Sequence, residues 1–93
     1  MKYYVYILKS LIDGTFYIGQ TNDLRNRLKR HNQGYIKSTK HKKPFDLCYF
    51  EEYNTRAKAM LREFEIKKKF NKNRREKLVE TFDSTKLKEI LGL

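Results

Sequence analysis

The sequence has little of several features that mark particular protein classes. It contains one cysteine, Cys48, which cannot form a disulfide within the chain and is too little for a cysteine-rich zinc site. No apolar run approaches the roughly 18 to 20 residues that a membrane-spanning helix needs. Met1 to Tyr3 lead directly into a strand pattern, and we expect no signal peptide there. These absences exclude a disulfide scaffold and predict a cytoplasmic protein.

Acidic residues are scarce in comparison with basic ones. The chain has 22 lysines and arginines against 11 aspartates and glutamates, a net charge of +11 and a pI near 9.8. A charge of this size on 93 residues indicates a polyanionic partner, DNA or RNA before an anionic membrane. Seven tyrosines and six phenylalanines supply apolar surface for one modest core, so we expect a single folded domain.

Two segments rich in aromatic and β-branched residues flank a turn signal near the N-terminus. Residues 3–9 (YYVYILK) and 15–20 (TFYIGQ) lie on either side of Asp13-Gly14, which predicts a β-hairpin. If opposing residue numbers sum to an odd value, even positions of one strand share a face with odd positions of the other. The hairpin then has an aliphatic face (Val5, Ile7, Phe16 and Ile18) and a tyrosine face (Tyr4, Tyr6, Leu8, Tyr17 and Gly19).

Capping residues predict where two longer helices begin. Thr21-Asn22-Asp23 should start a helix that ends at Gly34, and Asn54-Thr55 should cap a second helix that runs to Phe70. The apolar spacing of the second helix predicts the core-facing stripe Ala57, Met60, Leu61 and Phe64.

The order of the elements predicts the fold class. A third strand at 46–53 separates the two helices, and two short helices follow at 73–80 and 84–91. We expect an α/β protein of the α+β type, with a three-stranded antiparallel sheet flanked by helices. Residues 1–80 would form the domain, and residues 81–93 a short helical tail packed on it.

Three charged or titratable residues interrupt the apolar faces of the helices. Arg27 and His31 are i, i+4 neighbours on the stripe of the first helix, and they either converge on one spot or snorkel at its edge. Glu63 borders apolar neighbours and has only Lys67 as a helical partner. It either forms a salt bridge with Lys67 or Arg27, or binds a divalent cation together with a substrate phosphate.

These residues and their spacing resemble the GIY-YIG nuclease superfamily, in particular its small single-domain bacterial members. The signature segments are Tyr4-Val5-Tyr6 and Tyr17-Ile18-Gly19, and the two helices match as DLRNRLKRHNQG and AMLREFEIKK. The resemblance covers roughly residues 3–70 and implies the family fold. Tyr4 stands where the family has its first glycine, and the family asparagine beyond the glutamate helix has no clear counterpart.

The resemblance implies a divalent-metal-dependent endonuclease that cuts DNA with low sequence specificity. Tyr6 would be the general base or its relay, His31 would accept or share the proton, and Tyr17 would position the phosphate or the water. Arg27 would stabilise the pentacovalent phosphate, and Glu63 would hold one Mg²⁺ or Mn²⁺. A phenol with a pKa near 10 is a poor base at neutral pH, and the cation and Arg27 are the groups that could lower this pKa.

Further contacts with the nucleic acid are expected from a glycine and from basic side chains. Gly19 has no side chain and would let a phosphate or backbone approach closely. The basic loop and the C-terminal region should hold the phosphate backbone through Lys37, Lys40, Lys42, Lys43, Arg74, Arg75 and Lys77.

Two other functions stay open on the sequence. One is a nucleic-acid-binding module that keeps the fold and lacks useful catalysis, and the other is a protein-interaction adaptor whose positive charge is incidental. We expect no membrane partner, and the sequence points to no particular protein partner. A nuclease of this kind would serve DNA repair or recombination, on branched, nicked or single-stranded structures.

Overall fold

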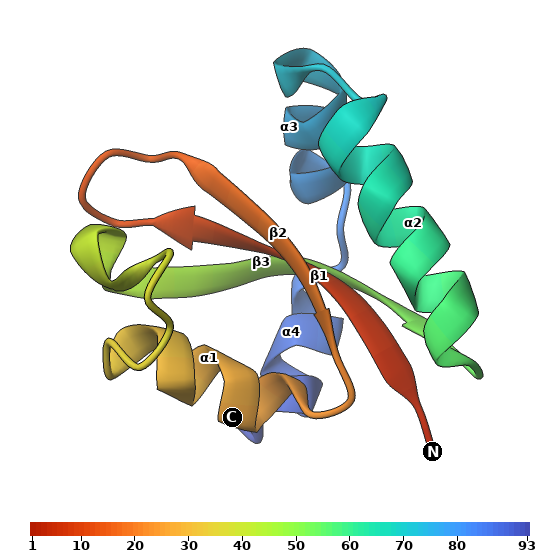
Figure 1. The fold of residues 1–93 in the computed structure, drawn as a ribbon, viewed down its shortest axis with the longest axis horizontal. Helices are drawn as coiled ribbons and strands as arrows, with labels where there is room; N and C mark the ends of the chain where they lie inside the picture. The colour runs from red at the N-terminus through yellow and green to blue at the C-terminus, as the bar shows by residue number, and fades with distance from the viewer.

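The computed structural model describes residues 1–93, and its centre is an antiparallel sheet in the order β2-β1-β3 (Figure 1). The strands are β1 (Tyr3–Ser10), β2 (Phe16–Thr21) and β3 (Phe45–Tyr53). The helical elements are α1 (Leu24–Asn32), the 3-10 turn η1 (Lys40–Lys42), α2 (Arg56–Lys68), α3 (Lys72–Glu80) and α4 (Ser84–Leu91). The predicted three-stranded sheet with flanking helices is therefore confirmed. None of the helices is long and apolar enough to cross a bilayer.

The hairpin has the predicted register. Tyr4 is opposite Thr21 and Tyr6 is opposite Gly19, so paired residue numbers have the odd sum of 25. Side chains of alternating residues therefore separate onto two faces, as the sequence predicts.

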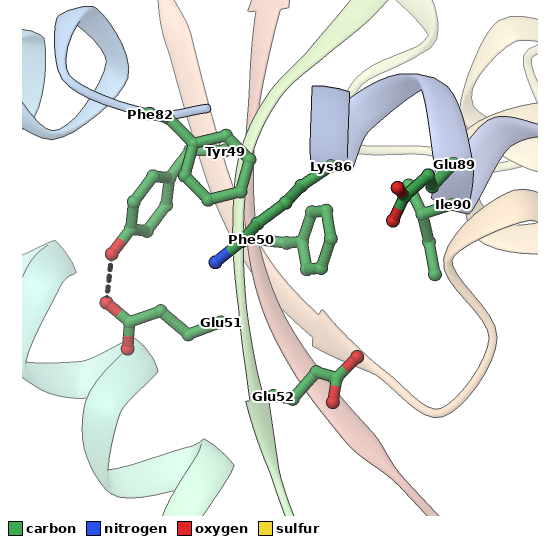
Figure 2. Close-up of a pocket in the computed structure, with 8 residues that line it drawn as sticks. All are labelled: Tyr49, Phe50, Glu51, Glu52, Phe82, Lys86, Glu89 and Ile90. Carbon is green, nitrogen blue, oxygen red and sulfur yellow. Dashed lines mark hydrogen bonds between the residues drawn. The ribbon is translucent and has the colours of Figure 1, made fainter. Parts of the chain in front are cut away.

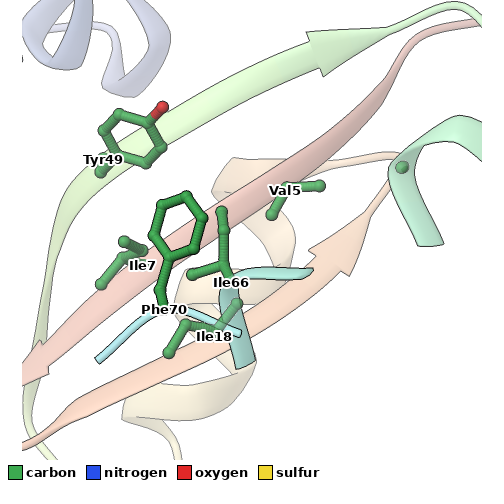
Figure 3. Close-up of a cluster of buried hydrophobic side chains, with 7 residues drawn as sticks. Val5, Ile7, Ile18, Tyr49, Ile66 and Phe70 are labelled. Atoms are coloured by element: carbon green, nitrogen blue, oxygen red, sulfur yellow. The ribbon is translucent and has the colours of Figure 1, made fainter. Parts of the chain in front are cut away.

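The aliphatic face of the sheet packs against α2 and α3. Val5, Ile7 and Ile18 form a buried cluster with Ile66 and Phe70, together with Tyr49 and Ala59 (Figure 3). Leu78 and Val79 of α3 pack against the same cluster. Packing against this cluster fixes the position of α2 on the sheet. It therefore also fixes the positions of the side chains on the adjoining face of this helix.

The tyrosine face packs against α1 and α4. Tyr6 and Leu8 are buried with Leu24 of α1, and α4 covers the same cluster with Leu87, Ile90 and Leu91. Phe82, in the link between α3 and α4, joins the two layers because its ring contacts both Tyr49 and Phe50, at centroid distances of 4.9 and 5.3 Å. Figure 1 shows this link passing between the two helices.

The predicted core stripe of α2 is wrong. Ala59 and Ile66 are the buried residues of this helix, whereas Met60 is 52%, Leu61 72% and Phe64 55% exposed; Ala57 is exposed as well. α2 has apolar residues on two faces. The face that packs on the sheet also forms an ion pair with it. Arg62 donates from Nε and Nη2 to the two carboxylate oxygens of Glu51 on β3, at 2.9 and 3.0 Å.

The ends of α1 follow the predicted signals. The Asp23 side chain accepts from the backbone N–H of Asn26 at 3.1 Å, which caps the helix at Leu24. Gly34 has φ of +80°, a left-handed conformation that glycine adopts without steric cost. The helix between these limits carries Arg27 and His31 toward the tyrosine face.

Candidate active site

A chain of hydrogen bonds runs from Tyr6 through His31 to Thr39. The Tyr6 hydroxyl lies 3.1 Å from His31 Nε2, and His31 Nδ1 lies 2.8 Å from the Thr39 hydroxyl. The three residues come from β1, α1 and the loop before η1, and their exposed fractions are 1%, 0% and 3%. His31 is therefore fully enclosed and does not snorkel at the edge of the helix.

Thr39 is the residue of this hydrogen-bond network that the sequence does not predict. It lies in a basic loop between Ser38 and Lys40, where no periodic pattern indicates which side chains turn inward. A threonine eight positions after His31 does not by itself indicate a contact with the imidazole. Only the path of the loop back to α1 shows the contact.

Gly19 makes room for the hydroxyl of Tyr6. A Cβ atom at position 19 would collide with the Tyr6 hydroxyl and ring, and it would lie 3.2 Å from a ring carbon of Tyr17. In the protein without substrate, the phenol of Tyr6 fills the space beside Gly19, where the sequence predicts that a phosphate or backbone approaches. Gly19 therefore serves the site by letting Tyr6 lie directly against β2.

Arg27 reaches the same hydroxyl. Its Nε donates to the Tyr6 oxygen at 3.4 Å, and this contact raises the pKa of Arg27. Burial raises the pKa of Tyr6 to about 12, although Arg27 acts to lower it. Arg27 thus acts on this pKa in the predicted direction, but in the protein without substrate or cation the desolvation of the phenolate outweighs the guanidinium.

His31 is neutral at physiological pH. Burial, with a smaller contribution from the positive charge of Arg27, lowers the pKa of His31 to about 4. A neutral imidazole has one nitrogen that donates and one that accepts a hydrogen bond. One nitrogen of His31 is therefore free to accept from a neighbouring donor, although its low pKa makes it a weaker base than an exposed imidazole.

Tyr17 and Glu63 complete the group from the β2 edge of the sheet. The Tyr17 ring lies 5.1 Å from the His31 ring and 6.4 Å from the Tyr6 ring, and the Lys67 ammonium lies 5.9 Å from the Tyr17 ring centre. Lys67 in turn forms an ion pair with Glu63 at 2.9 Å. The charge of Glu63 also acts on Tyr6 and Arg27, so the five residues that the sequence singled out, from β1, β2, α1 and α2, lie in one neighbourhood.

The donor set at Glu63 suits a cation that is shared with the substrate. No group of three or more His, Cys, Asp or Glu residues in the protein could enclose a metal ion. Mg²⁺ often binds proteins through one or two carboxylates together with phosphate oxygens of the substrate. Glu63 fits that role, and in the absence of substrate it pairs with Lys67, the salt bridge that the sequence left as the alternative.

The predicted backbone-binding residues differ in how available they are. Lys37, Lys40 and Lys43 are exposed on the loop, whereas Lys42 binds Asp13 at 3.4 Å and Thr15 at 3.3 Å. In α3, Arg74 and Lys77 are exposed, and the Arg74 guanidinium lies 3.8 Å from the Phe70 ring centre. Arg75 donates to the carbonyl oxygens of Ile66 and Lys67 at 3.0 and 2.5 Å. Arg75 therefore caps the end of α2 and is the least available of the seven.

A separate cavity lies between β3 and α4 (Figure 2). Its volume is about 670 Å³, and Tyr49 donates a hydrogen bond to Glu51 along one wall. Its charged lining consists of Glu51, Glu52, Glu89 and Lys86, and none of the five site residues lies in it. With three carboxylates against one lysine, this cavity suits phosphate less well than the Tyr6–His31 cluster, which is the better candidate for nucleic-acid chemistry.

Comparison with known proteins shows the family of this chain. The chain matches the GIY-YIG catalytic domain over residues 2–77. The chain belongs to the GIY-YIG family. This confirms the resemblance drawn from Tyr4-Val5-Tyr6 and Tyr17-Ile18-Gly19, and the GIY-YIG domain points to the nuclease superfamily.

Relatives of similar length align with most of this GIY-YIG chain. A UPF0213 protein from Staphylococcus saprophyticus is 39% identical over 79 residues, which cover 84% of this chain and 94% of that protein. A UPF0213 protein from Staphylococcus epidermidis is 43% identical over 67 residues, 71% of this chain and 80% of the relative. The solution NMR structure of a UPF0213 protein from Bacillus halodurans has a TM-score of 0.55 and 36% identity, covering 86% of this chain and 84% of that one.

Proposed function

We propose that the protein is a divalent-metal-dependent endonuclease that hydrolyses phosphodiester bonds in DNA with low sequence specificity. The observation that carries this proposal is the contact of Tyr6 with both His31 and Arg27, at 3.1 and 3.4 Å, in the group that Glu63 and Tyr17 complete. This group combines a proton acceptor, a phosphate-binding cation and a carboxylate. The net charge of +11 favours a polyanionic substrate.

Arg27 and Tyr17 are the residues that would meet the phosphate. Both are only partly buried, whereas Tyr6 and His31 lie behind them. A guanidinium can donate two parallel hydrogen bonds to a phosphate and keeps its charge at any working pH. Arg27 would therefore orient the scissile phosphate and stabilise the additional negative charge of the pentacovalent state.

Tyr6 would act as a relay between the attacking water and His31. Its pKa of about 12 means that the phenol holds its proton at neutral pH and is no base by itself. His31 Nε2, 3.1 Å away, can take the phenolic proton while the Tyr6 oxygen takes one from the water. The attacking oxygen then forms its bond to phosphorus, and the bond to the leaving oxygen breaks.

Glu63 would hold one Mg²⁺ or Mn²⁺ together with the substrate phosphate. A cation bound there would supply Lewis-acid stabilisation of the leaving oxygen. If Glu63 held a cation, Lys67 would be released from its ion pair and could bind a phosphate of the DNA backbone instead.

One observation favours the alternative of a binding module without catalysis. Tyr6 and His31 are 1% and 0% exposed, which a purely structural hydrogen bond would also show. In that case the protein would bind nucleic acid through its basic surface and cut nothing, and the loss of Glu63 would not weaken binding.

A cleavage panel separates the two functions. Plasmid, forked, flap and single-stranded DNA, with RNA of matched sequence, would be incubated with and without Mg²⁺ or Mn²⁺, and binding would be measured in EDTA. The endonuclease proposal predicts metal-dependent cutting of at least one DNA substrate and metal-independent binding. Binding to every substrate with no cutting under any metal condition would establish the binding module.

A further inference from the structure

The outward face of α2 carries an unpartnered apolar stripe, formed by Ala57, Met60, Leu61 and Phe64. Their spacing of i, i+3, i+4 and i+7 places them on one side of the helix. Met60, Leu61 and Phe64 are 52%, 72% and 55% exposed. Single exposed apolar residues are ordinary, but a contiguous row of large ones marks an interaction surface.

One end of the apolar stripe adjoins the candidate active site. Met60 lies three positions before Glu63, and Phe64 lies three positions before Lys67, so these four side chains are neighbours on the helix surface. The Glu63–Lys67 ion pair forms the border between the site and the stripe. A substrate strand that extended from Glu63 along this side of α2 would have its next nucleotides near Met60 and Phe64.

The charges around the stripe favour a nucleic acid over a protein as its occupant. Arg56, Lys58, Lys67 and Lys68 belong to the same helix, and the nearby carboxylate of Glu65 is already bound by Arg62. A second copy of the chain would bring another net charge of +11 against this surface. The three large side chains expose on the order of 350 Å², against about 800 Å² per partner in a standard protein interface.

Duplex DNA offers no apolar surface that could pack against the stripe. Duplex DNA turns its phosphates outward and its bases inward, and an apolar side chain gains nothing by desolvating a phosphate. Unpaired bases, in contrast, expose flat apolar faces that stack on aromatic side chains and on apolar wedges such as Met. We propose that Met60 and Phe64 bind unpaired bases next to the scissile phosphate, so that the enzyme selects strands that are single-stranded or locally unpaired. This rests on the proposed function for the position of the cut.

Binding measurements in EDTA test the proposal without requiring cleavage. Fluorescence anisotropy would compare a labelled single-stranded oligonucleotide with the duplex of the same sequence, for the wild type, Phe64→Ala and the control Leu61→Ala. Leu61 belongs to the same stripe but is not a helical neighbour of Glu63 or Lys67. We expect Phe64→Ala to weaken single-strand binding by roughly tenfold, the scale of one base stacked on an aromatic ring, with duplex binding unchanged and Leu61→Ala close to the wild type.

The contrary outcomes are distinct. An equal loss of affinity for duplex and single strand, or no loss at all, would overturn the proposal. If Leu61→Ala lost as much single-strand affinity as Phe64→Ala, the apolar stripe would have no particular link to the site. If the wild type sedimented as a dimer and Phe64→Ala as a monomer, the stripe would be the interface with a second copy of the chain. Failure of the endonuclease proposal would appear separately, as absent cleavage by a wild type that still prefers single strands.

The Thr39 hydroxyl supports a second inference on independent grounds, namely the direction of the hydrogen bonds around His31. Thr39 lies 2.8 Å from His31 Nδ1 and 3.4 Å from the carbonyl oxygen of Ile36. A carbonyl can only accept, so a hydroxyl that donates to Ile36 must accept from Nδ1–H. Arg27 then donates to Tyr6, Tyr6 to His31 Nε2, and His31 to Thr39, and each group is satisfied. In the opposite tautomer Tyr6 would accept twice, and its own buried proton would have no acceptor.

We infer that Thr39 is a positioning residue that holds His31 in the Nδ1–H tautomer and leaves Nε2 free to take the Tyr6 proton. Nitrogen chemical shifts of His31, measured by NMR in the wild type, Thr39→Val and Thr39→Ser, report the tautomer without any cleavage assay. We expect Nδ1–H in the wild type and in Thr39→Ser, and a mixture in Thr39→Val with kcat lowered by roughly tenfold or more at an unchanged KM.

An Nε2–H tautomer in the wild type would overturn this inference, as would a Thr39→Val variant with wild-type tautomer and kcat. If no substrate is cut, the NMR result still decides the tautomer, and the endonuclease proposal fails on its own. The wild-type tautomer is measured whether or not Thr39→Val folds, and Thr39→Ser, which keeps the hydroxyl and removes only a methyl group, controls for the change in volume.

Discussion

The buried state of His31 predicts how the stability of the fold depends on pH. Burial lowers the pKa of this imidazole from its ordinary 6.5 to about 4 in the folded protein. Between these two values the unfolded chain binds a proton that the folded chain does not. The free energy of unfolding therefore rises with pH through this window, and stability is lost as pH falls from 6.5 towards 4.

The size of this effect follows from the two pKa values. Each pKa unit corresponds to about 1.4 kcal/mol, so the difference amounts to on the order of 3 kcal/mol between pH 7 and pH 4. That is a large share of the stability of a small domain, which is about 5–15 kcal/mol. The pKa of the Glu51 carboxyl is lowered by its contacts with Arg62 and two tyrosines despite its burial, so this group stays ionised between pH 6.5 and 5. The interval from pH 6.5 to 5 therefore isolates the histidine.

Urea denaturation at half-unit pH steps from 7.5 to 4 would measure this slope. The chain offers a matched control, because its other histidine, His41, is exposed on η1. We expect His31→Gln to flatten the slope between pH 6.5 and 5 whatever its stability at pH 7, and His41→Gln to keep the wild-type slope. A wild type with constant stability across that interval, or an unchanged slope in His31→Gln, would show that burial does not hold His31 neutral.

Three further predictions concern the site and the basic loop. Tyr6→Phe keeps the ring but removes the relay, so cleavage should fall by roughly 10² or more while Tyr17→Phe is less impaired; full activity of Tyr6→Phe in a single-turnover assay would contradict the relay. Gly19→Ala places a methyl group against the Tyr6 hydroxyl and should lower stability by about 1–3 kcal/mol in urea melts; a wild-type melt would show that Tyr6 can move aside without cost. The four loop lysines are Lys37, Lys40, Lys42 and Lys43. Neutralising them should reduce the slope of log affinity against log salt concentration by roughly one for each phosphate contact that is lost. An unchanged slope would show that these lysines only interact with solvent.

The sheet and α1 could be predicted because their signals are local. Asp13-Gly14 fixes the turn, and the alternation around it fixes the register, so the separation of aliphatic and tyrosine faces follows. Asp23 and Gly34 mark the two ends of α1 within a few residues of the actual limits. Tyr6 and His31 stood out because they place polar groups on faces that otherwise point inward.

The orientation of α2 could not be predicted, because its sequence supports two apolar faces. Ala57, Met60, Leu61 and Phe64 are the better amphipathic stripe, yet Ala59 and Ile66 are buried. The contact of Arg62 with Glu51 joins residues eleven positions apart and appears only when β3 and α2 have packed. Tertiary contacts of this kind override a helical pattern.

The environment of Tyr6 was beyond the sequence for a related reason. The presence of Arg27 near a phenol was predictable, but the sign of the pKa change depends on how completely the hydroxyl is buried. Only the fold shows that His31, Gly19 and Arg27 enclose it. Thr39 and the capping role of Arg75 likewise depend on the path of the chain between the elements.

The most direct test of a metal-dependent nuclease site compares the wild type with Glu63→Gln in metal-dependent cleavage and in metal-free DNA binding. The substitution removes one charge and almost no volume, and the ion pair it breaks is partly exposed, with 21% of the Glu63 side chain accessible, so it contributes about 0–1 kcal/mol. We expect that Glu63→Gln melts like the wild type, binds DNA in EDTA at least as tightly, and cuts none of the substrates that the wild type cuts with Mg²⁺ or Mn²⁺. A Glu63→Gln protein that melts at a clearly lower temperature and still cuts DNA would contradict the assignment of Glu63 to the cation.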